Sequence, residues 1–328
     1  MTTMTRAAAL TNFERVAREC GLNGHALVRE IGLPARCLQD PDLRVPAASL
    51  GALLELAAAR SGEHAFGLRM AAARRLSNLG PLGLLLRDQS TLRDALQVLV
   101  AYVHTHAEAL SVSLLADGPI VIIREESMIE GGLPFPQAME MAMGTTFRLL
   151  RLFLGESWLP RMVTFRHAAP VNLSFHRSLF GSHVAFHQEF NDIVCSADDL
   201  DVPNPGADPV MAHYSQRLLE QQAGSHTTMS ERVRRLIILL LPRGNCRAEV
   251  IAQQLGVTRR TITNRLFAEG ATFKGLVDEI RRDLLATYLK EGSRNLSEVA
   301  TLLGFSELSA FSRWHRHQFQ VTASSRKE

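Results

Sequence analysis

The sequence predicts two domains: a mixed α+β domain in residues 1–223 and an all-α domain in residues 229–328 with two helix-turn-helix units. Both helical and strand-like apolar periodicities occur in the first part, and only helical ones in the second. Residues 224–228 are small and polar without periodicity, so we expect them to form the linker. The net charge also changes sign between these two parts of the chain. Residues 229–328 contain 17 Lys or Arg against 10 Asp or Glu (net +7), and residues 1–228 contain 19 against 23 (net −4).

Helices and strands alternate along the first domain. The helical spacing of Phe13, Val16, Ala17 and Cys20 predicts an opening helix over residues 11–31, with Gly21 placed where a C-cap would lie. A hairpin is expected around Asp117-Gly118, because this dipeptide between apolar runs favours a tight turn. Further helices are predicted over residues 47–59, 92–102 (capped by Thr91) and 135–154, and short strands over 162–166, 184–186 and 192–195. An amphipathic stretch, residues 210–222, either closes this domain or helps two protomers associate.

Several classes of protein are disfavoured by what the sequence does not contain. Its four cysteines lie far apart without a CxxC pair, which favours free thiols in a reduced, cytoplasmic protein that holds no metal. We expect no signal peptide and no membrane span, because residues 1–10 carry one Arg and the apolar runs are short. The sequence has no nucleophile elbow, Walker loop, HExxH or dinucleotide fingerprint, so we expect neither an enzyme nor a cofactor.

Two segments of the second domain share one pattern. In each, a short amphipathic helix with a central Ala is followed by Gly, an apolar residue, a hydroxyl residue and a second helix. The Gly permits a sharp turn, the apolar residue fills the corner, and the hydroxyl caps the next helix. The paired segments are residues 247–258 with 259–268, capped by Thr258, and residues 296–306 with 307–319, capped by Ser306. Two such copies in a domain of net charge +7 indicate DNA binding by helix-turn-helix units, rather than a module for protein contacts alone.

The second domain resembles the AraC/XylS family of transcription regulators. The resemblance lies in residues 296–307 (LSEVATLLGFSE) and 310–313 (AFSR), and reaches back through residues 250–252 and 255–261. It implies that one long helix, about residues 273–290, joins the two units. That helix would set two recognition helices about one DNA turn apart, in successive major grooves.

The resemblance also implies which side chains contact double-stranded DNA. Those expected at base edges are Arg260, Thr263, Asn264, Ser309 and Arg313. Those expected at phosphates are Arg259, Arg265, Ser312 and Arg316. The chain departs from the family at His315, where a core Phe is usual, and at Gln320 and Ala323, in place of Gly and Pro. These departures bear on the last helix, and we expect His315 to be a partly buried packing residue.

The first domain resembles the arabinose-binding-type effector domain of one AraC subgroup. The resemblance lies in residues 44–46 (RVP) through 53–57 (LLELA), 66–68 (FGL) and 79–83 (LGPLG). It implies a sensor for a small-molecule effector without naming the ligand, and the many helices argue against a cupin barrel. Polar residues among apolar ones are the candidate pocket groups: Tyr102, His104, His106, Arg124, Glu140, Arg148 and His167. Arg124 either meets an effector carboxylate or faces water from an edge strand.

Together these features predict a sequence-specific transcription regulator. The resemblance implies an activator, because activators are the commoner kind in that family. Its expected partners are promoter DNA, RNA polymerase, a small-molecule effector and a second copy of the chain. The alternative within the same family is a repressor that acts without an effector, or a global or virulence regulator.

Overall fold

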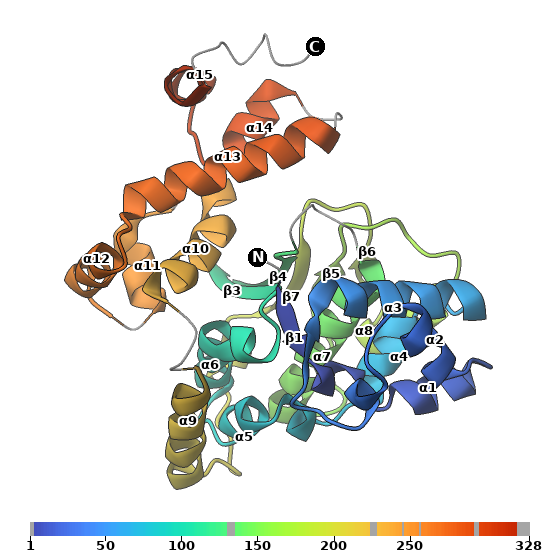
Figure 1. Cartoon of the computed structure of the whole chain (residues 1–328). Coiled ribbons are helices and arrows are strands. Elements are labelled where there is room, and N and C mark those ends of the chain that lie inside the picture. Colours follow the sequence, from blue (N-terminus) through green and yellow to red (C-terminus); the bar gives the residue numbers. More distant parts are fainter. Residues whose placement is uncertain are drawn as a thin grey trace. The chain divides into compact units, whose positions relative to one another are not determined.

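A computed structural model describes residues 3–129, 135–223, 228–244, 246–255, 257–291 and 295–319. The chain forms two compact units, Met1–Gly224 and Ser225–Glu328, which are coloured from blue to yellow and from gold to red in Figure 1. Of the predicted linker, residues 224–227 lie outside the described residues. Thr228 is the N-cap of the first helix of the second unit.

The first unit begins with a helical region closed by a small antiparallel pair, β1 (Met4–Arg6) with β2 (Arg44–Pro46). The prediction of one helix over residues 11–31 is wrong, because this segment forms two. The first helix ends before Gly21 (φ +76°), the residue that the sequence indicated as a C-cap, and the Asn23 side chain caps the second by accepting from Ala26 N–H. The helices of this region are α1 (Phe13–Glu19), α2 (Gly24–Glu30), α3 (Ala47–Ser61) and α4 (Phe66–Ala72).

A five-stranded sheet forms the other half of this unit, in the order β3-β4-β7-β5-β6. The predicted hairpin is confirmed as β3 (Leu110–Asp117) and β4 (Ile120–Ser127), which pair antiparallel around Gly118 (φ +57°). The remaining strands are β5 (Met162–Thr164), β6 (Val184–Ala185) and β7 (Asn191–Ser196). This mixed sheet among helices confirms the predicted α+β class.

The other helices of the first unit pack on and around the sheet. They are α5 (Pro81–Arg87), α6 (Leu92–His106), α7 (Pro136–Leu154), α8 (Ser174–Phe180) and α9 (Pro209–Ala223). The predicted cap of α6 is confirmed, since Thr91 Oγ1 accepts from Asp94 N–H at 3.1 Å. Phe147 of α7, Ile193 of β7 and the neighbouring Phe165 are fully buried in one apolar core. Short 3₁₀ turns occur at Ala7–Leu10, Ala35–Leu38, Leu76–Leu79, Asp198–Asp201 and, in the second unit, Leu241–Arg243.

The described residues of the second unit form helices and turns without a strand. The helices are α10 (Met229–Leu240), α11 (Ala248–Gln254), α12 (Arg259–Ala268), α13 (Phe273–Glu291), α14 (Leu296–Leu302) and α15 (Leu308–Phe319). Its apolar side chains form two clusters, one around Ile237 and Ile262 and one around Leu303 and Phe311. Helix α13 contributes to both clusters, which matches the predicted joining helix.

His315 completes the second cluster at the position where the family usually has Phe. Its side chain is 1% exposed, and its ring lies 5.8 Å from Phe311 and 4.8 Å from Phe319 between centroids. It is therefore a packing residue, as predicted, and more deeply buried than expected. Gln320 and Ala323 lie outside the described residues.

No helix in the described part of the chain is long and apolar enough to cross a membrane. Within the same ranges, no three His, Cys, Asp or Glu side chains gather as metal ligands would.

Candidate nucleic-acid interface

The first helix pair of the second unit is α11 with α12. Thr258 caps α12, since its Oγ1 accepts from Thr261 N–H at 3.1 Å, and this confirms the predicted cap. Ala252 is buried where the helices meet, and Val257 packs into the core at the corner. The predicted turn residue Gly256 lies outside the described residues.

The second pair is α14 with α15. Gly304 has φ +74°, and a Cβ at this position would lie 2.4 Å from the Leu241 carbonyl oxygen, so only glycine fits the turn. Phe305 fills the corner against Phe311, with ring centroids 5.7 Å apart. The predicted cap at Ser306 is wrong. Helix α15 begins at Leu308, and the N–H groups of Ala310 and Phe311 donate to the carbonyl of Glu307.

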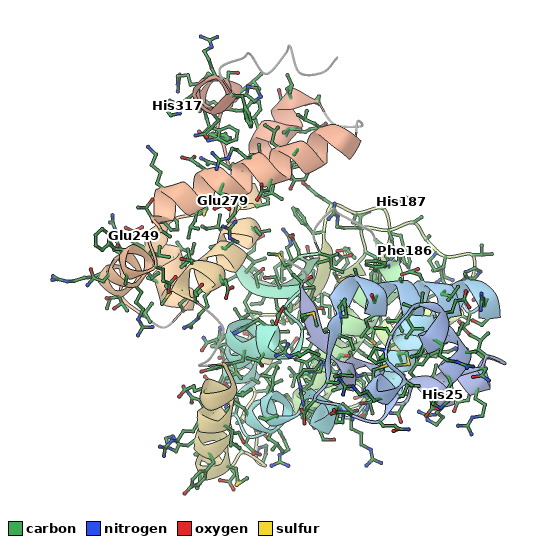
Figure 2. All side chains as sticks on the ribbon, viewed as in Figure 1. His25, Phe186, His187, Glu249, Glu279 and His317 are labelled. Carbon is green, nitrogen blue, oxygen red and sulfur yellow. The ribbon has the colours of Figure 1, made fainter. Side chains whose placement is uncertain are left out.

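Helix α13 holds the two pairs as one body (Figure 1). Its 19 residues span about 28 Å at 1.5 Å per residue, comparable to one turn of B-DNA. The Arg281 Nε donates to the Leu303 carbonyl at 2.9 Å, and Trp314 Nε1 donates to Asp278 Oδ1 at 2.9 Å, which fixes α14 and α15 against α13. Arg234 Nη2 lies 2.6 Å from Glu279 Oε2 (the glutamate labelled in Figure 2) and ties α10 to the same helix.

All nine predicted DNA-contacting side chains are exposed. On α12, Arg260, Thr263 and Asn264 lie on the side away from the buried Ile262 and Leu266. Arg259 Nη1 pairs with Glu249 Oε1 at 2.6 Å, with the two side chains 68% and 57% exposed. A surface pair so exposed stabilises little, so a phosphate can compete for this guanidinium.

On α15, Ser309, Ser312, Arg313 and Arg316 follow helical spacing on the face opposite the buried Phe311 and His315. A hollow of about 310 Å³ is lined by Ser312, Arg313, Arg316 and His317. Sequence reasoning missed His317, which is labelled in Figure 2, although its position four residues after Arg313 places it beside that arginine.

In the first unit, Arg124 is paired internally. Its Nε and Nη2 donate to the two carboxylate oxygens of Asp192, both at 2.7 Å, and the guanidinium lies 3.2 Å from the Phe190 ring centroid. The strand that carries it, β4, lies between β3 and β7 and is not at an edge. Arg124 therefore does meet a carboxylate, but one that belongs to this chain, and it does not face water.

Two of the candidate pocket groups come together with a histidine that the sequence reasoning missed. Glu140 Oε1 lies 2.7 Å from Nε2 of His176 and 3.4 Å from Nε2 of His167, and both Glu140 and His176 are fully buried. Burial lowers the pKa of His167, and the nearby Glu140 partly opposes this effect. Phe165 and Phe186, the latter labelled in Figure 2, pack their rings against both histidines.

The other candidates lie elsewhere in the first unit. Tyr102 donates to Glu220 Oε1 of α9 at 3.4 Å, and Arg148 donates to the Ala72 carbonyl at 2.9 Å from an exposed position. His104 and His106 are buried near the end of α6, and burial and the nearby Arg74 hold the pKa of His106 well below its usual value.

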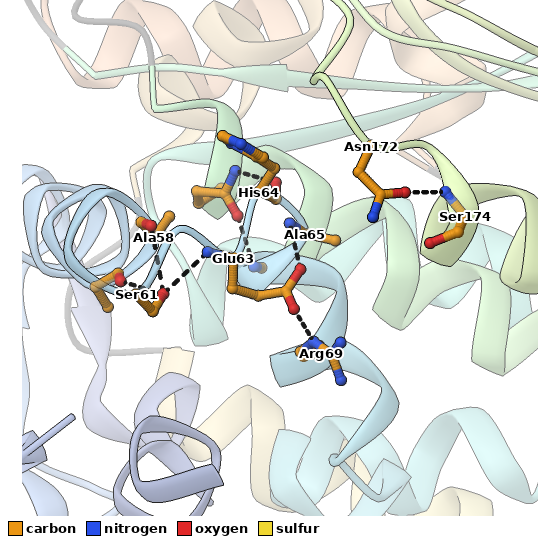
Figure 3. Close-up of polar contacts among 11 residues, drawn as sticks. Ala58, Ser61, Glu63, His64, Ala65, Arg69, Asn172 and Ser174 are labelled. Carbon is orange, nitrogen blue, oxygen red and sulfur yellow. Dashed lines mark hydrogen bonds and ion pairs between the residues drawn. The ribbon is translucent and has the colours of Figure 1, made fainter. Parts of the chain in front are cut away.

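Internal hydrogen bonds also organise the turn between α3 and α4 (Figure 3). Glu63 accepts from Arg69 Nε at 2.6 Å, and Ser61 Oγ donates to the carbonyls of Ala57 and Ala58. The side chain of Gln137 donates to the His64 carbonyl at 2.9 Å. The last contact joins this turn to α7, the helix that also carries Glu140.

Two helix pairs on one joining helix, with basic and polar side chains exposed on the second helix of each, define a DNA-binding protein of the helix-turn-helix class. A family model, "Arabinose-binding domain of AraC transcription regulator, N-term", matches residues 21–204, and "Helix-turn-helix domain" matches residues 251–327. The chain is 32% identical over 322 residues to the HTH-type transcriptional regulator VirS of Mycobacterium tuberculosis, covering 97% of this chain and 95% of VirS. The chain therefore belongs to the AraC-type family of HTH transcription regulators.

Two further proteins are similar. The ornithine utilization regulator of Pseudomonas aeruginosa is 25% identical over 301 residues, covering 91% of this chain and 88% of that protein. A crystal structure of the transcriptional regulator CdpR from Pseudomonas aeruginosa superposes with a TM-score of 0.45 at 20% identity, covering 93% and 96% of the two chains.

Proposed function

We propose that the second unit binds a specific duplex by inserting α12 and α15 into successive major grooves. The observation that carries this proposal is the pair of exposed polar faces held on one body by α13. Arg260 and Arg313 would donate hydrogen bonds to guanine O6 and N7, and Asn264 would pair with adenine. Thr263 on α12 and Ser309 on α15 would contact neighbouring base edges. Arg259, Arg265, Ser312 and Arg316 would contact phosphates, for which the hollow beside Arg313 and Arg316 provides room.

The test is fluorescence anisotropy of the full chain on duplex DNA from upstream of its own gene, against scrambled duplex, across a salt series. We expect a preference for the native duplex and a steep loss of affinity as salt rises. Arg260→Ala and Arg313→Ala should each reduce that preference by about tenfold, while Arg316→Ala weakens both duplexes alike. Arg29→Ala removes one charge from an exposed position on α2 and serves as the control. No binding to either duplex at low salt would contradict the proposal.

We propose that the first unit binds a small-molecule effector at Glu140, His167 and His176. The effector would change DNA affinity because it binds two states of the protein with different affinity. Glu140 Oε2 and His176 Nδ1 are buried, and neither has a hydrogen-bond partner within the described ranges. A buried carboxylate among aromatic rings suits an amine-bearing ligand, and the name of the Pseudomonas aeruginosa relative concerns ornithine, an amine. Amines that raise the melting temperature of the wild type but not of Glu140→Gln would support this site. The other predicted pocket residues lie elsewhere in the first unit and would contact a ligand at Glu140 only if this unit rearranged: Tyr102, His104, Arg124 and Arg148.

We further propose that the chain acts without catalysis, as a homodimeric activator that contacts RNA polymerase in the cytoplasm. The dimer is supported by an apolar stripe on α9, where Val210, Met211, Tyr214 and Leu218 are between 40% and 63% exposed. Positions 210, 214 and 218 recur every four residues, so these side chains form one continuous strip of helix surface.

A further inference from the structure

Helix α12 exposes a large apolar side chain that the DNA contacts proposed above do not use. Phe267 is 80% exposed, whereas Phe311 in the same unit is fully buried. The helix does not need this ring for its packing, because Ile262 and Leu266 already anchor α12 in the core. An exposed phenyl ring is unfavourable in water, so an apolar surface that covers it in a complex would be favoured.

The position of Phe267 on α12 indicates which molecular surface would contact its ring in a complex. At 100° per residue, Arg260, Thr263, Asn264 and Phe267 fall within about 100° of arc, opposite the buried residues. Phe267 therefore lies on the face proposed to enter the major groove. Arg260 precedes it on this face, and Glu269 and Gly270 follow the end of the helix. The rise of 1.5 Å per residue places it about 10 Å from Arg260 along the helix, or about three base pairs.

The major groove of B-DNA displays one apolar group among its base edges, the C5 methyl of thymine. An apolar protein surface is a poorer match, because the exposed Arg260 lies on the same face of α12 and its positive charge suits a polyanion. Resting on the proposed DNA binding through α12, we propose that Phe267 is a specificity-determining residue that packs on a thymine methyl about three base pairs from the base read by Arg260.

The test deletes methyl groups from the DNA one at a time. A preferred site is first selected from a random duplex pool with the full chain, and each thymine in it is then replaced by deoxyuridine. For the wild type we expect one thymine, or two adjacent ones, whose methyl removal weakens binding about fourfold, the effect of losing one buried methyl. Phe267→Ala should bind the thymine duplex several-fold more weakly and be indifferent to uracil at that same position. Phe267→Leu should restore most of the methyl dependence.

Two controls separate this proposal from the one on which it rests. Leu152→Ala removes an exposed apolar side chain of the first unit and should leave both affinity and methyl dependence unchanged. If Arg260→Ala retains full affinity and base preference, α12 does not enter the groove, and the proposed function fails together with this inference. If Arg260→Ala loses its preference while Phe267→Ala keeps the wild-type response to every uracil, only the role of Phe267 is overturned. A Phe267→Ala protein that binds DNA normally but fails to activate transcription would also overturn it, by assigning the ring to a protein partner.

Discussion

At the scale of single residues, the first unit contains an ion pair that is almost completely buried. The Arg124–Asp192 pair joins residues 68 positions apart, and its side chains are 6% and 13% exposed. Its two hydrogen bonds and the ring of Phe190 replace the water that both groups lose on folding. Removing one member would leave the other as an unpaired buried charge.

We therefore expect Asp192→Ala to lower the free energy of unfolding by about 3–5 kcal/mol. The matched control is Asp201→Ala, which breaks the exposed pair of Arg93 with Asp201 and should lower the free energy of unfolding far less, because solvent screens that pair. Urea denaturation of both variants measures the difference. Equal losses of unfolding free energy in the two variants would show that the buried Arg124–Asp192 pair stabilises the protein no more than the exposed pair does.

Glu125 gives the first unit a dependence on pH. Its side chain is fully buried, and burial raises its pKa to about 7. Because the folded pKa exceeds the unfolded value of 4.5, the folded state binds the extra proton between those pH values. The contribution of Glu125 to stability is therefore greatest below pH 4.5 and is lost as pH rises toward 7.

We expect Glu125→Gln to remove this loss, which amounts to about 3 kcal/mol between the two limits. Unfolding free energies of the wild type and the variant at pH 5 and pH 8 measure it. The gain from the substitution should be clearly larger at pH 8. A constant difference between the two proteins across this range would mean that Glu125 titrates normally.

At the scale of elements, α4 and α7 approach closely because small residues face each other. Gly144 of α7 lies against Ala71, and a Cβ on Gly67 of α4 would lie 2.0 Å from the Gln137 carbonyl oxygen. That oxygen belongs to the backbone, so a larger residue would force the two helices apart. The amide of Gly67 also donates to Gln137 Oε1 at 2.8 Å, which adds a polar contact to the close approach.

Gly67→Ala should consequently lower the free energy of unfolding of the first unit by about 1–3 kcal/mol, the usual cost of overpacking. Gly206→Ala is the control, because its added Cβ would meet only Asn204 Oδ1, at 3.5 Å. Thermal unfolding followed by circular dichroism compares the two variants. A Gly67→Ala protein as stable as the wild type would show that α4 and α7 can separate freely.

At the scale of the whole molecule, the chain combines a unit that we propose to sense an effector with one that contacts DNA. A homodimer would place four recognition helices on one DNA site and raise its effective affinity. The apolar stripe of α9 belongs to the first unit, so the side chains that would form the dimer differ from those proposed to contact DNA.

The dimer is tested with Tyr214→Glu combined with Leu218→Glu, which places two charges on the stripe. Sedimentation should change from dimer to monomer, because burying unpaired carboxylates at an interface is costly. Gln216→Glu adds a charge on another side of α9 and should leave the dimer intact. A wild-type protein that is monomeric at all concentrations would contradict the proposal.

Signals within a few residues of one another were enough to predict much of this protein. The hairpin at Gly118, the caps at Thr91 and Thr258, the turn at Gly304 and the joining helix follow from turn residues, caps and periodicity. The net charge of +7 and the two repeated motifs predicted a DNA-binding class from the sequence alone. These features are local, and each has its own physical cause in the chain nearby.

Only the tertiary structure decided which distant groups meet. The sequence does not reveal that Arg124 is neutralised by Asp192, that Glu140 bonds to His176, or that Phe267 is exposed while His315 is buried. The first helix ends at Gly21, where the sequence indicated a C-cap, but the second helix that Asn23 caps was not predicted. Pairing and burial depend on how separate elements pack, and residues far apart in the sequence supply the partners, so periodicity cannot specify them.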